Sequence, residues 1–260
     1  MSEDPFGRWL ACLLEGDGAN LALASAGPEP TTLAIAKVNN SCQAAYDFHI
    51  VGTSAPNFTS GMMQGHLPPT TAALHVGTLG FLLEPIASTL VTLVKQEGPG
   101  RLVMLDPNIR PALVADAERY RQRLHSVIGR STIVKASEED VSWLYPGMSF
   151  ERGADTLLGR GVRLVVVTLG ANGAYAAMAG SRVNVEAPEV VVVDTIGAGD
   201  AFGAALLFWL YDMGRLHADF TLNEVELRSA LEFACRVAAI TCTRAGADPP
   251  SREELVGLSG

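Results

Sequence analysis

The spacing of hydrophobic and polar positions changes near residue 72, and the two parts of the chain predict different structures. In the first part, residues 5–14 place Phe6, Leu10, Leu13 and Leu14 on one helical face. Three short strand-like runs follow, separated by turn residues such as Asn39-Asn40-Ser41, and they comprise residues 20–24, 31–38 and 44–51. We expect the last two runs to form a hairpin within a small antiparallel sheet.

From residue 72 onward, short apolar runs alternate with helical patterns. The predicted strands are residues 72–76, 101–105, 132–134 and 163–168, and the predicted helices are 85–96, 116–128, 138–144 and 154–159. Such alternation favours an α/β fold with three layers, in which helices flank a mostly parallel sheet. The remaining expected elements are a hairpin at 175–185, a buried strand at 190–193, helices at 200–211 and 224–244, and a short last helix.

Composition narrows the class of protein. The chain has 260 residues, 48% of them hydrophobic, and a formal net charge of −9, with no basic run, so we expect no nucleic-acid partner. The most apolar stretch, 72–94, contains His75, Glu84 and Pro85, which argues against a membrane span. None of the four cysteines forms a CxxC pair, which favours buried free thiols in a cytoplasmic protein.

The segment 190–203 combines an apolar run, a glycine-rich turn and the start of a long helix. Gly197 and Gly199 allow backbone conformations that other residues avoid, and the free N–H groups of a helix N-terminus suit a phosphate. Asp200 lies in the first helical turn, where it is either a proton acceptor beside that phosphate or simply a stabilising charge. The chain has no Walker P-loop, and the spacing of its glycines does not fit a dinucleotide-binding fingerprint.

Residues Asp194 to Phe202 match the signature Asp-Thr-Xaa-Gly-Ala-Gly-Asp-Xaa-Phe and resemble the ribokinase-like (phosphofructokinase-B) sugar kinases. The resemblance implies phosphoryl transfer from ATP to a sugar, assisted by Mg²⁺ and a monovalent cation, K⁺. It implies that Asp200 is the catalytic base and contacts the sugar, and that the backbone of Gly197, Ala198 and Gly199 forms an anion hole.

The segment 106–111 resembles the Asp-Xaa-Asn-Xaa-Arg segment of the fructokinase and ketogluconate kinase branch. The resemblance implies that Asn108 lies near the sugar and Arg110 near the transferring phosphoryl group, although a surface salt bridge would equally explain Arg110. The acceptor implied is a keto-sugar, fructose in the first place. A kinase for 2-keto-3-deoxygluconate or a nucleoside is the near alternative.

Further nucleotide and metal positions follow from the resemblance alone. Residues 135–140 stand in the place of the family's Asn-Xaa-Xaa-Glu motif, with Ser137 and Asp140 substituted, and a capping box explains these two residues equally well. The implied nucleotide-binding residues are Lys135, Ser137, Thr168, Gly170, Gly173 and Gly246, and the implied metal-binding residues are Asp140, Asp194 and Ile196.

The small sheet resembles the family's lid. We expect a lid at 20–51 and a core formed by 1–19 and 52–260, with Tyr46 and Phe48 packing in the lid and Phe48 touching the sugar. The resemblance also implies a possible contact between two copies of the chain through this lid.

The family's first strand and its Gly-Gly-Xaa-Xaa-Asn segment have no match in this chain. The explanations left open are a wrong start codon, a truncated chain and a degenerate paralogue. The last gives a second class of function, a catalytically weak nucleotide-binding remnant with a regulatory or interaction role. An NAD-binding oxidoreductase is a more distant alternative, because the glycine spacing does not fit.

Overall fold

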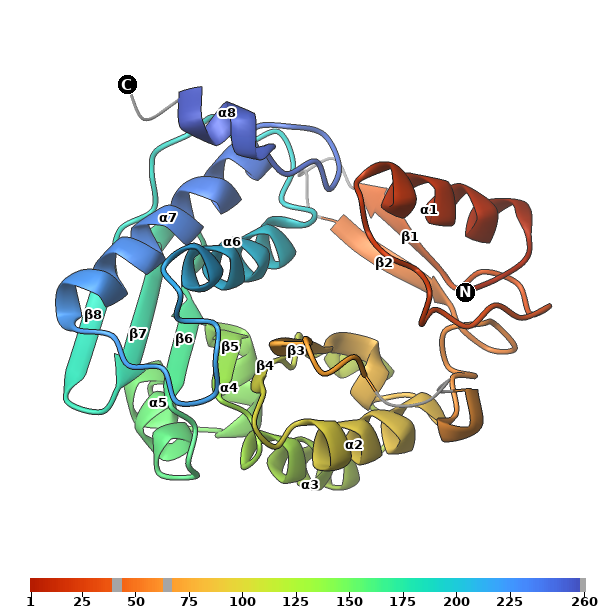
Figure 1. Ribbon diagram of the computed structural model, residues 1–260, viewed down its shortest axis with the longest axis horizontal. Coiled ribbons are helices and arrows are strands. Elements are labelled where there is room, and N and C mark those ends of the chain that lie inside the picture. Colours follow the sequence, from red (N-terminus) through yellow and green to blue (C-terminus); the bar gives the residue numbers. More distant parts are fainter. Residues whose placement is uncertain (39–43, 63–66, 258–260) are drawn as a thin grey trace. The chain divides into compact units, whose positions relative to one another are not determined.

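The computed structural model describes residues 1–38, 44–62 and 67–257 (Figure 1). The chain divides into two compact units. The first comprises Met1–Pro69 and Leu79–Glu97, and the second comprises Thr70–Thr78 and Gly98–Gly260.

In the first unit, Asp4 organises the start of helix α1 (Pro5–Gly16). Its Oδ1 accepts a hydrogen bond from the Gly7 N–H at 2.8 Å, and its Oδ2 accepts one from the Thr31 N–H at 2.7 Å. Strands β1 (Leu33–Val38) and β2 (Ala44–His49) pair antiparallel, which confirms the predicted hairpin. Its turn, Asn39-Asn40-Ser41, lies outside the described residues. The other regular elements described in this unit are a 3₁₀ helix, η1 (Ser60–Met62), and helix α2 (Ile86–Glu97). A second 3₁₀ helix, η2 (Thr78–Phe81), begins at the last residue of the second unit's first segment and continues into the first unit.

One expectation for the first unit is corrected. Residues 20–24 form a turn and not a strand, because the Asn20 side chain accepts a hydrogen bond from the Ala22 N–H at 2.9 Å and closes a local turn. The apolar residues of α1 are exposed, with Phe6 and Leu13 retaining 53% and 48% of their accessible surface.

The second unit is built on a six-stranded sheet in the order β3-β4-β5-β6-β7-β8. Its first four strands are parallel, and β7 and β8 form an antiparallel hairpin at one edge. The strands are β3 (Ala73–Gly77), β4 (Leu102–Asp106), β5 (Ile133–Ser137), β6 (Leu164–Thr168), β7 (Ala174–Met178) and β8 (Ser181–Val185). The predicted parallel sheet and terminal hairpin are therefore confirmed.

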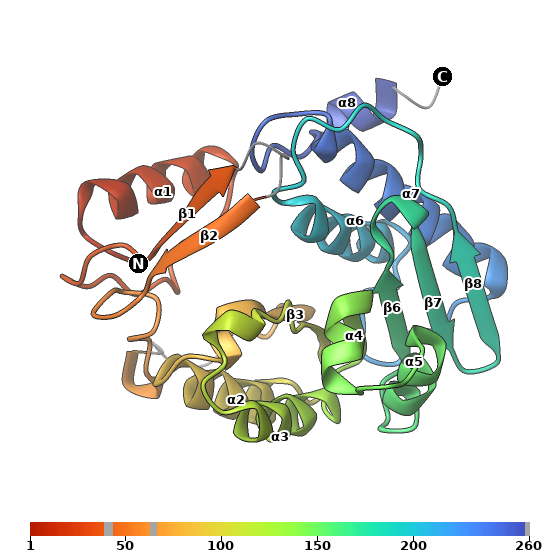
Figure 2. The same ribbon diagram turned by 180° about the vertical axis from the view of Figure 1, so that it is seen from behind.

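Helices cover both faces of this sheet. The two views place α6 (Ala198–Asp212) and α7 (Glu224–Cys242) on one face, opposite α3 (Ala117–Ile128), α4 (Glu138–Leu144) and α5 (Phe150–Leu158) (Figures 1 and 2). Residues of β4, β5 and β6 are almost fully buried, as near-continuous apolar strands between two helical layers must be. The predicted three-layer α/β architecture is confirmed. Helix α5 begins at Phe150, earlier than expected, because Ser149 caps it, and α8 (Arg252–Gly257) follows the proline-rich turn.

The predicted buried strand at 190–193 is wrong. These valines are exposed, Val191 retaining 85% of its accessible surface, and the segment pairs with no strand in the described part of the sheet. Instead, the Val193 and Asp194 N–H groups donate to the Cys242 carbonyl at the end of α7, at 2.8 and 3.2 Å. An apolar run alone therefore does not distinguish a strand from an extended loop.

Among the cysteines, Cys235 is buried, Cys242 is half-buried and Cys12 is exposed, and all three are free thiols. The expectation of buried thiols is thus wrong for Cys12, and Cys42 lies outside the described residues. Within the described ranges, no helix is both long and apolar enough to cross a membrane.

Candidate active site

A left-handed glycine opens helix α6. Gly197 is the N-cap residue with φ 79°, and a Cβ at this position would lie 2.7 Å from the Ala247 Cβ. Both observations require glycine. Glycine has no side chain with which to cap the helix, so no side chain caps α6, although the Ala198 N–H donates to the Thr195 carbonyl at 3.3 Å. The helix dipole favours a negative charge at this terminus.

Asp200 lies in this first turn and is exposed. Within the described ranges, no hydrogen bond or ion pair engages its carboxylate. Asp200 and Gly197 line one end of a mostly apolar cavity of about 410 Å³ between α6, α7 and the segment that follows α7. The structure therefore leaves this carboxylate accessible beside the anion-binding turn.

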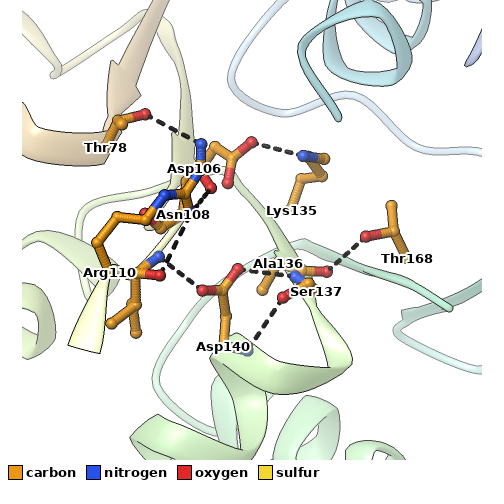
Figure 3. Close-up of polar contacts among 10 residues, drawn as sticks. Thr78, Asp106, Asn108, Arg110, Lys135, Ala136, Ser137, Asp140 and Thr168 are labelled. Carbon is orange, nitrogen blue, oxygen red and sulfur yellow. Dashed lines mark hydrogen bonds and ion pairs between the residues drawn. The ribbon is translucent and has the colours of Figure 1, made fainter. Parts of the chain in front are cut away.

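A buried ion pair lies beside the same turn. Asp106 ends β4 and Lys135 lies in the middle of the neighbouring strand β5. The Asp106 Oδ2 and Lys135 Nζ atoms are 2.6 Å apart, with 6% of each side chain exposed (Figure 3). A Cβ built on Gly199 would lie 3.2 Å from Lys135 Nζ, so the ammonium group is close to the turn that precedes Asp200. A fixed positive charge at this point reinforces the helix terminus as an anion site.

His75 completes this polar cluster. Burial raises the pKa of Asp106, and the Lys135 ammonium opposes that rise. Desolvation lowers the pKa of His75, and the charges of Asp106, Lys135 and Asp200 also act on it. Neither His75 nor Asp106 was among the predicted site residues. The signal for Asp106 is a polar residue at the carboxyl end of an otherwise apolar strand, where α/β proteins bind ligands, whereas His75 lies in the middle of β3.

Asn108 and Arg110 follow β4 on the same edge. Arg110 Nη1 donates hydrogen bonds to the Asn108 side-chain oxygen and to the carbonyls of Asn108 and Ile109. Asn108 Nδ2 lies 3.5 Å from the Thr78 hydroxyl at the end of β3 (Figure 3). The structure thus joins Asn108 and Arg110 directly, and the alternative explanation for Arg110, a surface salt bridge, does not occur among the described residues.

Ser137 and Asp140 form the capping box of α4. The Ser137 hydroxyl accepts from the Asp140 N–H at 3.1 Å, and Asp140 Oδ2 accepts from the Ser137 N–H at 2.9 Å. Asp140 Oδ1 accepts from the Ile109 N–H at 2.7 Å, which ties α4 to the loop after β4. Both carboxylate oxygens are therefore engaged by backbone donors.

Asp194 links the glycine-rich turn to the end of the chain. Its Oδ1 accepts from the Ile196 N–H at 3.0 Å and its Oδ2 from the Gly246 N–H at 2.9 Å. These two bonds, the Ile196 bond first, lower the pKa of Asp194. Asp194 and Ile196, which were predicted to bind a cation, thus lie together with Gly246, which was predicted to bind the nucleotide. The backbone N–H groups of Ile196 and Gly246, and not their carbonyl groups, face the Asp194 carboxylate.

The turn after β6 requires glycine at two positions for different reasons. Gly170 has φ 58° with open space around its Cα, whereas a Cβ on Gly173, at φ 93°, would overlap the Val185 carbonyl oxygen. Thr168 Oγ1 lies 3.5 Å from the Ala136 carbonyl on β5. Thr168 and the glycines therefore shape a turn on the same sheet edge as Lys135.

Phe48 belongs to the first unit, where it is half-buried, so the described geometry does not join it to the residues above. The side chain of Tyr46 lies outside the described residues.

The residues present fit an anionic group better than a metal ion. The uncapped helix terminus and Lys135 offer positive potential, which suits the phosphates of a nucleotide. No group of three or more His, Cys, Asp or Glu side chains in the described part of the chain is arranged to hold a metal. A divalent ion here would need most of its ligands from phosphate oxygens and water.

Known proteins resemble this chain over most of its length. The sequence profile described as pfkB family carbohydrate kinase matches residues 3–254. A fructokinase of Rhizobium leguminosarum bv. trifolii is 33% identical over 80% of this chain, and the match spans 63% of that relative, less than two thirds of its length. Fructokinase-1 of Oryza sativa subsp. japonica is 30% identical over 99% of this chain and 80% of its own.

A solved structure extends the likeness to three dimensions. The fructokinase of Vibrio cholerae O395, crystallised with fructose, ADP and a calcium ion, aligns with a TM-score of 0.83 and 25% identity. The alignment covers 99% of this chain and 82% of that one.

Proposed function

This chain belongs to the pfkB family of carbohydrate kinases, and from that premise we propose that it transfers the γ-phosphoryl group of ATP to a hydroxyl of a keto-sugar, with fructose as the preferred acceptor. The observation that carries the proposal is the exposed Asp200 carboxylate in the first turn of α6, beside a helix terminus that suits an anion. Two relatives and one structural neighbour named fructokinase support the choice of acceptor.

In the proposed reaction, Asp200 accepts the proton of the sugar hydroxyl while that oxygen forms its bond to the γ-phosphorus. The bond between the γ-phosphorus and the β,γ-bridging oxygen breaks, and ADP leaves. The backbone N–H groups of Gly197, Ala198 and Gly199 and the Lys135 ammonium hold the negative charge that spreads over the phosphoryl oxygens.

The remaining site residues take supporting roles in this proposal. Asn108 and Arg110 orient the sugar and the phosphoryl group, and Thr168, Gly170, Gly173 and Gly246 border the nucleotide. Mg²⁺, when bound, would neutralise phosphate charge, and Asp140 and Ser137 would act on it only through water, since backbone donors already engage the Asp140 carboxylate. Asp194 and Ile196 are the residues that would hold K⁺. Phe48 contacts the sugar from the lid, through which two copies of the chain associate.

The test is Asp200→Asn, which keeps the size of the side chain and removes its basicity. We expect kcat for fructose to fall by about 10² to 10⁴-fold, while the calorimetric Kd for ATP changes by about twofold or less. Asp212→Asn is the matched control, because it removes the same charge from the other end of the same helix, where Asp212 faces Arg252 at 3.7 Å. It should keep wild-type activity.

A coupled assay of ADP release over fructose, 2-keto-3-deoxygluconate and a nucleoside ranks the acceptors. Wild-type kcat in Asp200→Asn would show that another group is the base. ATP binding without turnover of any acceptor would support the nucleotide-binding remnant in place of a kinase.

A further inference from the structure

Two non-glycine residues adopt left-handed backbone conformations side by side. Thr78 has φ 55° and Asn108 has φ 40°, and they are the non-glycine residues with positive φ in the described part of the chain. Each follows the end of a parallel strand, and the strand ends Gly77 and Asp106 are partners in the register of β3 and β4. A β-branched residue at positive φ is unfavourable and persists only where the surrounding structure imposes it.

The surroundings of Thr78 do impose this conformation. A Cβ on Gly77 would overlap the Asp106 carbonyl oxygen, so β3 and β4 approach more closely at their ends than two ordinary residues allow. The backbone must then turn sharply at the next residue, and glycine would do so without strain. Because glycine would avoid the strain at position 78, we expect the threonine side chain itself to have a role there.

The orientation of the Asn108 amide shows what that side chain faces. Arg110 has only donors, so the Asn108 atom that it contacts must be Oδ1, and Nδ2 must face Thr78 (Figure 3). The distance from Nδ2 to the Thr78 Oγ1 is 3.5 Å, at the outer limit of a hydrogen bond. Both groups therefore keep hydrogen-bonding capacity for a third partner.

We infer that Thr78 is a substrate-positioning residue whose hydroxyl, together with Asn108 Nδ2, binds one hydroxyl group of the acceptor sugar. Nδ2 donates a hydrogen bond to the sugar oxygen, and the Thr78 hydroxyl accepts a hydrogen bond from the sugar hydroxyl or donates one to it. Because neither group is charged, the pair suits a neutral polyhydroxy compound. This inference rests on the proposed kinase function and adds to it a contact at the first residue after β3.

Thr78→Val tests the hydroxyl alone, because valine has the same shape and is equally β-branched, so the backbone strain is unchanged. We expect KM for the sugar to rise about tenfold, as loss of one hydrogen bond to a substrate hydroxyl predicts, with the Kd for ATP unchanged. Thr78→Ser, which retains the hydroxyl, should stay within about twofold of wild type. A wild-type KM in Thr78→Val would overturn the inference.

Thr78→Gly tests the strain. Glycine fits φ 55° without penalty, so we expect the melting temperature to stay the same or rise by a few degrees, while KM for the sugar rises as in the valine variant. A drop in melting temperature with an unchanged KM would make Thr78 a structural residue and would contradict the inference. If the wild-type protein phosphorylates no sugar, the proposed function itself fails, and this is seen before any Thr78 variant is compared.

Discussion

At the scale of single residues, the buried pair of Asp106 and Lys135 shows how structure and function share the same groups. Taking two charges out of water is costly, and the 2.6 Å contact offsets that cost only while both partners are present. The pair therefore adds little net stability, yet it fixes the Lys135 ammonium near Gly199, where the proposed reaction needs positive charge.

A double-mutant cycle separates these two contributions. Lys135→Met leaves a buried carboxylate without a partner, and Asp106→Leu leaves a buried ammonium, so each should lower the free energy of unfolding by about 3 to 5 kcal/mol. The double variant replaces both charges with apolar groups and should return to within about 1 kcal/mol of wild type, measured by urea unfolding. It should nevertheless bind ATP poorly. Additive losses in the double variant would show that the two charges do not depend on each other.

At the scale of secondary-structure elements, sequence patterns predicted most of what the structure contains. Strands β3 to β6 and helices α3, α4 and α7 follow from alternating apolar runs with clear caps, such as Asp116 before α3 and the capping box at Ser137. The prediction of a buried strand at residues 190–193 was wrong, because four consecutive β-branched residues have the composition of a buried strand whether they are buried or exposed. Whether such a run is buried depends on partners that are distant in sequence.

The residues of the candidate site could be predicted where a short, contiguous motif is enough to identify them. Asp200 and the glycines before it could be placed at a helix terminus from their spacing, and their chemistry came from the family resemblance. His75 and Thr78 could not be found in this way. Their roles depend on the neighbouring strand, and neither the register between strands nor a positive φ at a threonine can be inferred from the local sequence.

The glycine at the start of α6 leads to a prediction about stability. Gly197→Ala combines an unfavourable left-handed backbone with a Cβ contact of 2.7 Å to Ala247, so we expect a loss of roughly 1 to 3 kcal/mol in the free energy of unfolding. Gly214→Ala, just after the other end of the helix, has φ 65° and open space, so it measures the backbone effect alone. Chemical denaturation of both variants should show the larger loss at Gly197. Equal losses would mean that Ala247 moves aside without cost.

The link between Asp194 and Gly246 predicts how stability depends on pH. The Ile196 and Gly246 N–H groups lower the pKa of Asp194 in the folded protein below its unfolded value of about 3.9. The contribution of Asp194 is then fully present above that value and is lost as the pH falls through the folded pKa. We expect Asp194→Asn to lower the urea midpoint at pH 6, and the difference from wild type to shrink below about pH 4. A difference that stays constant from pH 6 to pH 3 would show that ionisation of Asp194 does not matter.

At the scale of the whole molecule, the sequence predicted the architecture of the larger unit more fully than its chemistry. The change of hydrophobic spacing near residue 72 falls close to the start of the sheet at Ala73. From that point, apolar strands alternate with helices, as a parallel sheet covered by helices requires. The proposed activity came from family resemblance, since one α/β architecture serves many reactions.

The exposed valine loop has a practical consequence for anyone who purifies this protein. Four consecutive β-branched apolar residues in an extended segment form a ready template for pairing with another chain. The net charge of −9 keeps copies apart at neutral pH, but this repulsion disappears near the isoelectric point of about 5.0. We therefore expect the protein to stay in solution in dilute stocks and in buffers near pH 8, and to precipitate in acidic crystallisation conditions.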